Sequence, residues 1–325
     1  AEGIKFKKVY AGKLRRYFSL LNIVDFFKTI IGSFRAIWMI FLEMPHIIIG
    51  KGGYASFPVL LAGRLFNIPI IIHESDSVPG KVNKWAGGFA KRVAISFPEA
   101  SEYFQEEKIA LTGVPVRKGI AVKPNKIESQ ELLNLEKDLP TILVLGGSQG
   151  SQKINEIILD SLPELTKSFQ IIHQCGKKNE KETMELSKII LEKSENKNRH
   201  HLYPHLNDSL IRSSAGSTDL VISRAGGSAI YEIATWNLPS IIIPIKNSAQ
   251  NHQRENAYSY KKAGACEVIE ENNLSSNILI SEISRIFEDK ERIEKMKISA
   301  QKFSKPEASR KIAKEIINLA LEHSS

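Results

Sequence analysis

Residues 141–151 read TILVLGGSQGS, and this stretch decides the fold class. The apolar run Thr141–Leu145 predicts a buried strand. A glycine-rich turn follows it, and the apolar side chains between residues 154 and 162 then recur on one side of a helix. A strand that passes through a tight glycine turn into a helix is the repeating unit of a parallel sheet with helices on both faces.

The same alternation of short apolar runs, polar or glycine turns and helical stretches begins at Met44 and continues along the chain. We therefore expect an α/β protein whose strands fall into two parallel sheets. Besides residues 141–145, the expected strands are 46–49, 68–73, 92–96, 169–174, 219–223 and 240–244.

Residues 122–140 separate the two groups of strands, are polar and carry prolines near both ends. Such a composition is typical of an interdomain connection. We predict an N-terminal domain over residues 1–121 and a C-terminal domain over residues 141–304. Residues 305–325 are predicted to form a C-terminal helix that packs back on the N-terminal domain.

The charge of the chain is unevenly distributed. The formal net charge is +9, and residues 1–64 hold ten Lys or Arg against three acidic residues. An excess of this size predicts an anionic partner. Because no zinc-finger or RNA-binding signature accompanies it, an anionic membrane surface is favoured over nucleic acid.

The two cysteines, Cys175 and Cys266, are far apart in the sequence and belong to no Cys/His cluster. This pattern predicts neither a disulfide framework nor a zinc site, and it fits a reducing cytosol. We expect no metal and no cofactor.

Residues 17–44 are apolar enough to suggest a membrane span, but four charges interrupt them and gather on one side of a helix wound at about 100° per residue. Two interpretations of this amphipathic helix stay open: its apolar face packs on the sheet, or part of it contacts a membrane. The second interpretation exposes Phe26, Phe27, Phe34 and Trp38, beside Lys13, Arg15 and Arg16.

Two strand–turn–helix units in the C-terminal half suggest a phosphate ligand. The turns are residues 146–150 and residues 224–228, and Glu232 follows the second turn in its helix. Backbone N–H groups at such turns bind phosphate, and a carboxylate nearby suits ribose hydroxyls. The alternatives are glycines kept for steric reasons and an ordinary first-turn glutamate.

Two nucleotide-binding classes are disfavoured. The turn at residues 146–150 is not the GxxxxGK[ST] motif of P-loop NTPases. It also lacks the GxGxxG pattern, and the next strand ends His173-Gln174-Cys175, where a dehydrogenase needs an acidic residue.

Four further polar segments follow predicted strands or precede helices. Residues 247–256 are rich in neutral amides, which suit sugar hydroxyls, although a plain surface loop explains them equally. Residues 50–56 and 73–76 lie at the carboxyl ends of strands, where open parallel sheets bind ligands. Residues 112–117 end in Arg117, for which two interpretations stay open: a cation that reaches across the cleft, or a solvated side chain. His73 is likewise either a ligand contact or a hydrogen-bonded core residue.

Six segments in order resemble one known family: GKGGYASFP, HESDSVPGKVNKW, TGVPVR, GGSQGS, SRAGGSAIYEIA and NHQRENA. Their order and spacing are similar to those of the MurG family, the N-acetylglucosaminyltransferases that convert lipid I to lipid II in peptidoglycan biosynthesis. The resemblance implies two Rossmann-like domains that face each other across a cleft, the glycosyltransferase B architecture. It also implies a peripheral enzyme on the cytoplasmic face of the cell membrane.

The resemblance implies an inverting transfer of N-acetylglucosamine from UDP-N-acetylglucosamine to the 4-hydroxyl of undecaprenyl-pyrophosphoryl-N-acetylmuramoyl peptide. The C-terminal domain would hold the donor, and the N-terminal domain would face the acceptor and the membrane. Two alternatives stay open: a transferase acting on another lipid acceptor such as diacylglycerol, and a catalytically silent relative that binds a nucleotide sugar.

By the same resemblance, Glu232 would bind the ribose, Leu206 would lie by the uracil, and Arg117 would reach a phosphate from the opposite domain. Asp76 stands where the family usually has Asn. The expected donor-side residues are Asp76, Arg117, Gly147, Ser148, Gln149, Leu206, Arg224, Gly226, Gly227, Ser228, Glu232, His252, Gln253 and Asn256. The expected acceptor-side residues are Gly52, Gly53, Tyr54, Ser56, His73 and Glu74.

The family opens with a GGTGGH-like loop whose histidine is its proposed catalytic base. The sequence starts beyond that point, so we expect about 30 residues or more to be missing. The base is then expected to be absent and turnover to be low, with His73 and Glu74 as weak candidates for the role.

Overall fold

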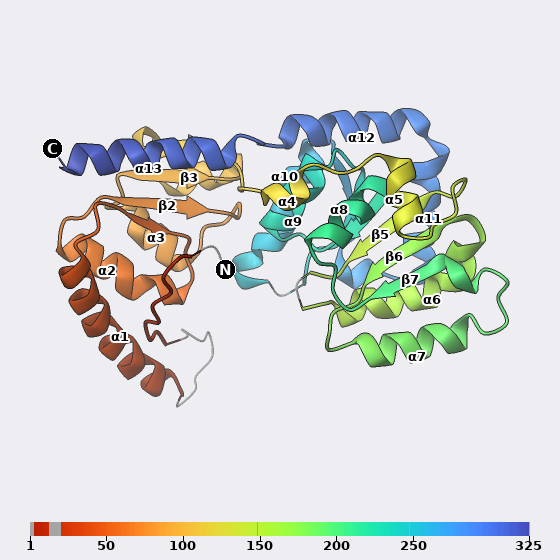
Figure 1. The fold of residues 1–325 in the computed structure, drawn as a ribbon, viewed down its shortest axis with the longest axis horizontal. Helices are drawn as coiled ribbons and strands as arrows, with labels where there is room; N and C mark the ends of the chain where they lie inside the picture. The colour runs from red at the N-terminus through yellow and green to blue at the C-terminus, as the bar shows by residue number, and fades with distance from the viewer. Residues whose placement is uncertain (1–2, 13–20, 148, 247, 325) are drawn as a thin grey trace. The chain divides into compact units, whose positions relative to one another are not determined.

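The computed structural model describes residues 3–12, 21–147, 149–246 and 248–324. It divides into two compact units (Figure 1). The first contains the chain up to Gly113 together with the segment from Glu307 onward, and the second is Val114–Pro306. Among the described residues, no helix combines the length and apolar character needed to cross a bilayer.

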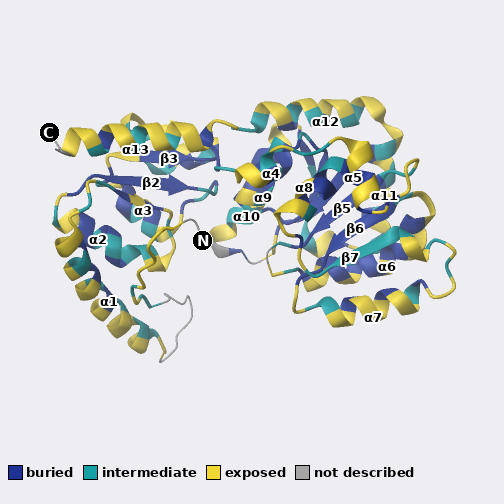
Figure 2. Cartoon of the chain, in the orientation of Figure 1, coloured by how far each residue is buried: buried dark blue, intermediate teal, exposed yellow. Residues whose placement is uncertain are grey.

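The first unit is built on a parallel sheet in the order β1-β2-β3-β4. Its strands are β1 (Ile48–Gly50), β2 (Ile70–Glu74), β3 (Arg92–Ile95) and β4 (Ile109–Leu111). Its helices are α1 (Leu21–Glu43), α2 (Phe57–Leu65), α3 (Lys81–Gly87) and α13 (Ala308–Ser324), with 3-10 turns at Tyr54–Ser56, Pro98–Tyr103 and Glu106–Lys108. Strand β2 is buried along its whole length, so the core of the unit lies on both sides of it (Figure 2).

The second unit is built on a parallel sheet in the order β10-β9-β8-β5-β6-β7. Its strands are β5 (Thr141–Leu145), β6 (Gln170–Gln174), β7 (His200–Tyr203), β8 (Leu220–Ser223), β9 (Ser240–Ile242) and β10 (Cys266–Val268). Its helices are α4 (Lys118–Ala121), α5 (Lys126–Leu132), α6 (Gln152–Ser168), α7 (Glu180–Ile190), α8 (Asp208–Ser217), α9 (Gly227–Thr235), α10 (His252–Lys262), α11 (Ser276–Glu288) and α12 (Lys290–Phe303), with 3-10 turns at Lys197–Arg199, Ala249–Asn251 and Glu271–Asn273.

The order of the second sheet places its topological switch point at β5 and β8. Strand β5 is flanked by β6 on one side and by β8 on the other. Helix α6 contacts α7 and α11, whereas α8 contacts α4 and α5 (Figure 1). Parallel α/β sheets bind ligands outside the carboxyl ends of the strands at such a point. The two glycine turns therefore lie where this architecture places a ligand site.

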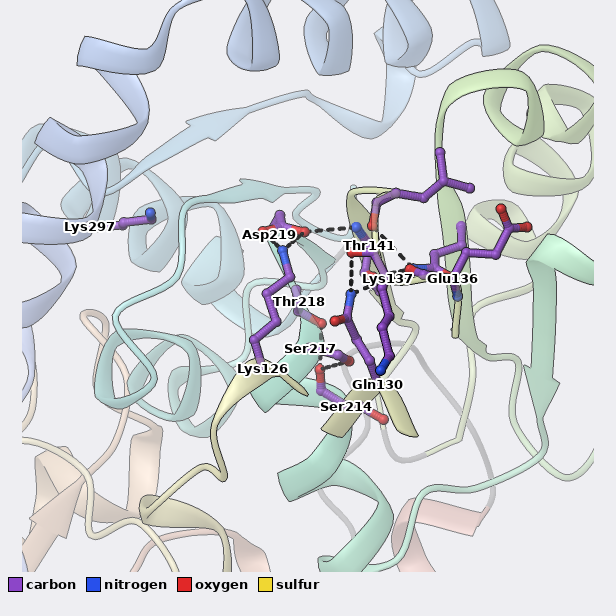
Figure 3. A network of polar contacts seen from close by, with 12 residues as sticks. Lys126, Gln130, Glu136, Lys137, Thr141, Ser214, Ser217, Thr218, Asp219 and Lys297 are labelled. Carbon is purple, nitrogen blue, oxygen red and sulfur yellow. Dashed lines mark hydrogen bonds and ion pairs between the residues drawn. The ribbon is translucent and has the colours of Figure 1, made fainter. Parts of the chain in front are cut away.

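A polar network fixes the opposite, amino end of the same strands (Figure 3). Asp219 accepts a hydrogen bond from the Thr141 N–H (2.9 Å) and pairs with the Lys126 Nζ (2.6 Å). The Gln170 amide donates to the Glu136 carbonyl (2.8 Å) and to the Thr141 hydroxyl (3.1 Å). These bonds join the starts of β5, β6 and β8 without approaching the glycine turns.

The predicted interdomain linker over residues 122–140 is instead part of the second unit, which begins at Val114. Ile120 is fully buried, and its carbonyl accepts a hydrogen bond from the Trp236 Nε1 (2.8 Å). Helix α5 packs on α8. The prolines near both ends of this segment delimit a short packed helix rather than an exposed connection. At the other end of the chain, Glu315 of α13 pairs with Arg92 in the first unit (2.8 Å).

Helix α1 exposes most of its apolar side chains. It buries Gly32, Ala36 and Ile40 and packs on α2. The exposed fractions of its aromatic residues are 63% for Phe26, 57% for Phe27, 70% for Phe34 and 63% for Trp38. The structure thus shows both a narrow face of α1 packed in the core of the unit and a set of exposed aromatic side chains. The basic residues Lys13, Arg15 and Arg16 lie outside the described residues.

Candidate active site

The turn after β5 requires glycine at two positions. Gly147 and Gly150 have positive φ angles of 88° and 78°. A Cβ on Gly150 would lie 2.1 Å from the Cys175 carbonyl oxygen, so no larger residue fits there. Ser151 caps the N-terminus of α6 by accepting a hydrogen bond from the Ile154 N–H (3.4 Å). The turn thus leads into the positive end of a 17-residue helix, as a phosphate site requires. Ser148 lies outside the described residues, and Gln149 is exposed.

The turn after β8 forms a second helix N-terminus at the same edge of the sheet. Gly226 is the N-cap of α9, and a Cβ there would contact nothing within 4 Å. Gly227 is buried in the first turn, whereas Ser228 is exposed. Since β5 and β8 are neighbours, the two helix N-termini follow adjacent strands and suit the two phosphates of one diphosphate.

Glu232 and Arg117 form an ion pair beside the second turn. The Glu232 side chain is 23% exposed, and its Oε1 lies 3.6 Å from the Arg117 Nη2. Arg117 also pairs with Asp208 at the start of α8 (2.5 Å). Burial raises the pKa of Glu232, and the guanidinium of Arg117 lowers it in opposition. Arg117 was expected on the opposite domain, but it belongs to the second unit, which also holds Glu232.

The segment before α10 has a strained backbone. Gln250 and Asn251 have positive φ angles of 58° and 56°, a conformation that is uncommon for residues other than glycine. Strain of this kind clusters at functional loops. The Gln253 side chain accepts a hydrogen bond from the Ile245 N–H (3.2 Å), and His252 is partly buried beside it.

In the first unit, the loop after β1 also depends on glycine. Gly52 and Gly53 have positive φ angles of 78° and 76°, and a Cβ on Gly52 would lie 2.8 Å from the Asn83 Nδ2. The Ser56 hydroxyl lies 2.9 Å from the carbonyl oxygens of both glycines. Tyr54 is 47% exposed. The loop is therefore shaped by its own hydrogen bonds and presents an aromatic side chain to solvent.

Glu74 holds the loop after β2 in place. Its carboxylate accepts hydrogen bonds from the Asp76 N–H (3.0 Å), the Gly80 N–H (3.2 Å) and the Asn83 Nδ2 (2.8 Å). Glu74 is 4% exposed, and burial raises its pKa. Asp76 itself is partly buried. The network explains why a polar run follows this strand: the carboxylate organises the loop.

His73 is 2% exposed, and its Nε2 lies 3.1 Å from the Gly113 carbonyl oxygen. Its Nδ1 is buried and has no hydrogen-bond partner among the described residues. Burial lowers the pKa of His73. Neither His73 nor Glu74 reaches the surface of the unit, which weakens both as candidates for the catalytic base.

No group of three His, Cys, Asp or Glu side chains in the described part of the chain is placed to hold a metal ion.

Comparison with known proteins places the chain among glycosyltransferases. The model of the glycosyltransferase family 28 N-terminal domain matches residues 1–95, and the model of the family 28 C-terminal domain matches residues 141–316. A Clostridium botulinum protein, UDP-N-acetylglucosamine--N-acetylmuramyl-(pentapeptide) pyrophosphoryl-undecaprenol N-acetylglucosamine transferase, is 38% identical over 290 residues, which are 89% of this chain and 78% of that protein. The protein of the same name from Clostridium tetani is 35% identical over 303 residues, 93% of this chain and 81% of its own.

The chain belongs to glycosyltransferase family 28, in its MurG branch. Among solved structures, MurG of Acinetobacter baumannii is similar with a TM-score of 0.71 and 25% identity, over 90% of this chain and 79% of its own. The S. aureus MnaA–UDP structure has a TM-score of 0.64 at 16% identity, over 88% and 80% of the two chains, and at that identity it supports the fold alone.

Two of the residues expected on the donor side form hydrogen bonds that support the loops. Arg224 is buried, and its Nη2 donates to the Ser151 hydroxyl (2.6 Å) and pairs with Glu271 (2.5 Å). Asn256 is fully buried, and its Nδ2 donates to the Ala225 carbonyl (3.1 Å). Arg224 therefore links the glycine turn after β8 to the residue that follows the glycine turn after β5. Asn256 anchors the turn after β8.

The sequence analysis missed Gln174 as a site residue. This residue ends β6, is 8% exposed and hydrogen-bonds to two loops that hold expected donor-side residues. Its Nε2 donates to the Gly147 carbonyl (3.3 Å), and its Oε1 accepts from the Leu206 N–H (3.0 Å). A polar residue at the carboxyl end of an otherwise apolar strand was the available signal in the sequence.

Proposed function

We propose that this chain transfers N-acetylglucosamine from UDP-N-acetylglucosamine to the 4-hydroxyl of undecaprenyl-pyrophosphoryl-N-acetylmuramoyl peptide, with inversion. The observation that carries the proposal is the pair of helix N-termini after β5 and β8 with Glu232 beside them, in a chain 38% identical to a transferase named for these substrates. This arrangement suits a nucleoside diphosphate attached to a sugar.

The reaction is a direct displacement at the anomeric carbon. The 4-hydroxyl oxygen forms the new bond to that carbon, its proton passes to a general base, and the bond to the diphosphate oxygen breaks. The electron pair leaves on UDP. Negative charge therefore grows on the diphosphate, where the N-termini of α6 and α9 provide backbone N–H groups and the positive ends of helix dipoles.

Each part of the donor has a proposed contact in the second unit. Glu232 accepts hydrogen bonds from the ribose hydroxyls, and Arg117 opposes the rise in the Glu232 pKa that burial causes. Leu206 lies by the uracil, and Gln253 with His252 faces the acetylated sugar. The proposed diphosphate contacts are Gly147, Ser148, Gln149, Gly226, Gly227 and Ser228.

The first unit is proposed to face the acceptor and an anionic membrane surface. The loop around Gly52, Gly53 and Tyr54 supplies the acceptor side. Helix α1 supplies an exposed apolar surface, and a groove of about 340 Å³ runs beside it. The groove is lined by Phe26, Thr29, Ile30, Ser33, Phe34, Ile37, Phe57 and Leu61. We infer a peripheral enzyme at the cytoplasmic face of the cell membrane, because an aromatic helix of this kind suits the headgroup region.

The decisive experiment measures UDP binding and sugar transfer together. Glu232→Ala is expected to weaken UDP binding by about 1.5–3 kcal/mol, the scale of losing hydrogen bonds to a charged group. Glu164→Ala on α6 is the matched control, because Glu164 is an exposed glutamate that pairs with Lys167. Isothermal titration of the folded proteins gives the affinities.

Equal UDP affinity in Glu232→Ala and the parent protein would remove Glu232 from the site. Transfer of labelled N-acetylglucosamine to a lipid I analogue tests the reaction itself. Transfer to a diacylglycerol acceptor instead would identify a different lipid substrate.

A further inference from the structure

The carboxyl end of β6 lies between the two loops that the proposed function assigns to the diphosphate and to the uracil. Gly147 belongs to the first loop and Leu206 to the second. They are 59 positions apart in the sequence, and the Gln174 side chain hydrogen-bonds to the backbone of both (3.3 Å and 3.0 Å). One amide therefore uses its donor on one loop and its acceptor on the other.

The backbone that carries Gln174 is held firmly on both sides. The Cys175 N–H donates to the Tyr203 carbonyl (3.0 Å), which continues the pairing of β6 with β7. The Cys175 carbonyl accepts hydrogen bonds from the Asn155 Nδ2 (2.9 Å) and the Asn179 Nδ2 (2.9 Å). Gln174 thus projects from a fixed point toward both loops.

The contacts of the first loop add to this arrangement. Gly150 packs directly against the Cys175 carbonyl and Gly176, at distances that exclude any side chain on Gly150. The diphosphate loop therefore rests on the end of β6 through van der Waals contact at Gly150 and through a hydrogen bond at Gly147. Leu206 is buried, so its loop also packs against the protein.

We propose that Gln174 is a positioning residue that couples the diphosphate loop to the uracil loop and so fixes their separation before the donor binds. This inference rests on the proposed function for the identity of the ligand. A UDP group spans both loops, so its affinity depends on the spacing that Gln174 sets. Groups held in place before binding reduce the free-energy cost of ordering on association.

The test uses Gln174→Met, which keeps a side chain of similar length but removes both hydrogen bonds. We expect faster amide hydrogen exchange at Leu206 and through residues 146–151 in the free protein. We also expect the UDP dissociation constant and the KM for UDP-N-acetylglucosamine to rise about tenfold while kcat changes little, as for lost uniform binding.

A second variant separates the two hydrogen bonds. Gln174→Glu keeps an acceptor for the Leu206 N–H but loses the donor to the Gly147 carbonyl. Protection of the Leu206 amide is therefore expected to persist in this variant, while residues 146–151 exchange faster. This variant also serves if Gln174→Met fails to fold.

Gln170→Met is the matched control. Gln170 lies on the same strand, is also buried, and forms its hydrogen bonds at the amino end of the sheet. We expect this variant to unfold more easily but to leave the exchange of both site loops and the UDP affinity of the folded protein unchanged.

The outcomes separate this inference from the proposed function. Unchanged exchange in both loops of Gln174→Met, or unchanged UDP affinity in that variant while the parent protein binds UDP, would overturn the coupling role. If the parent protein binds no UDP while the loops still loosen in Gln174→Met, the coupling stands and the donor assignment fails.

Discussion

At the scale of single residues, three contributions of opposing sign act on the pKa of Glu232. Burial in the second unit raises its pKa, the guanidinium of Arg117 lowers it, and the carboxylate of Asp208 raises it. The Arg117 Nη2 lies 3.6 Å from the Glu232 Oε1, and Arg117 also pairs with Asp208, so two carboxylates share one guanidinium. Arg117 therefore favours the ionised form of Glu232, the form that suits ribose hydroxyls.

Arg117→Met is expected to raise the pKa of Glu232 further. Protonated Glu232 is a poorer acceptor, so the loss of UDP affinity on acidification should begin at a higher pH in this variant. Titrations of UDP binding from mildly acidic to neutral pH check this. Arg212→Met, which removes an exposed arginine from α8, is the control. If UDP affinity begins to fall at the same pH in Arg117→Met and in the parent protein, the expectation is contradicted.

Glu74 gives a stability prediction in the first unit. Its carboxylate accepts three hydrogen bonds, and Gln at this position has only one acceptor oxygen, so Glu74→Gln should lower the free energy of unfolding by about 1–3 kcal/mol. Denaturant unfolding measures it, with the exposed Glu102→Gln as control. Equal unfolding free energies in these two variants would show that the loop does not depend on the Glu74 carboxylate.

The pH dependence of stability has a definite sign at Glu74. Burial raises its folded pKa above the unfolded value, so the folded protein binds the proton more tightly. The free energy of unfolding therefore falls as the pH rises from the unfolded pKa through the folded pKa. Glu74→Gln should abolish this fall, and unfolding curves recorded across that interval test it.

Single residues also mark the limit of what the sequence predicts. The sequence gives the type of Arg224 and Asn256 but not the direction of their side chains, and both point into the protein. Gln174 was missed for the complementary reason. Its contacts are to residues far away in the sequence, and local patterns carry no information about such contacts.

At the scale of elements, the same substitution is expected to affect stability differently in the two glycine turns. Gly150→Ala should destabilise the protein by about 2 kcal/mol or more, because it combines a positive φ with a Cβ placed 2.1 Å from the Cys175 carbonyl. Gly226→Ala has a φ of −68° and open space around the new Cβ, so its stability should be close to that of the parent. Thermal unfolding of both variants checks this, and equal losses would contradict the difference.

The central strands of both described sheets were predictable from the sequence, whereas of the four edge strands only β1 was predicted. The predicted strand Thr141–Leu145 is confirmed, and residues 169–174 and 219–223 each include one residue too many. The strands β4, β7 and β10 were missed because they are short and lie at sheet edges, where no continuous apolar run is required. The misplaced linker has a similar cause, since α4 and α5 are short and polar on the outside.

At the scale of the whole molecule, the second unit carries the contacts proposed for the donor and the first unit those proposed for the acceptor and the membrane. The alternation of strands and helices was enough to predict two parallel α/β domains. Residues 114–140 belong to the second unit because Ile120 is buried there and its carbonyl accepts a hydrogen bond from Trp236. Trp236 is far from Ile120 in the sequence, so no local pattern predicts this contact.

The apolar surface of α1 leads to a prediction about membrane binding. Phe34 and Trp38 are 70% and 63% exposed, and full burial of an aromatic ring contributes about 1.5–3 kcal/mol. The double variant Phe34→Ser and Trp38→Ser should therefore bind anionic vesicles at least about tenfold more weakly in cosedimentation, with unchanged UDP affinity. Charge reversal of Lys13, Arg15 and Arg16 should also weaken binding, since each cation near such a surface contributes about 1 kcal/mol that salt screens.

Helix α13 offers the matched control for this experiment, because Ile317 and Leu321 are exposed apolar residues of the same unit, at 58% and 65%. Their double substitution by Ser removes comparable apolar area from a different face. If the α13 variant weakens vesicle binding as much as the α1 variant does, the loss reflects general hydrophobicity, and α1 is not a specific membrane-contact helix. Equal binding of the parent protein to neutral and anionic vesicles would remove the electrostatic part of the proposal, because the cations of the first 64 residues would then make no contribution.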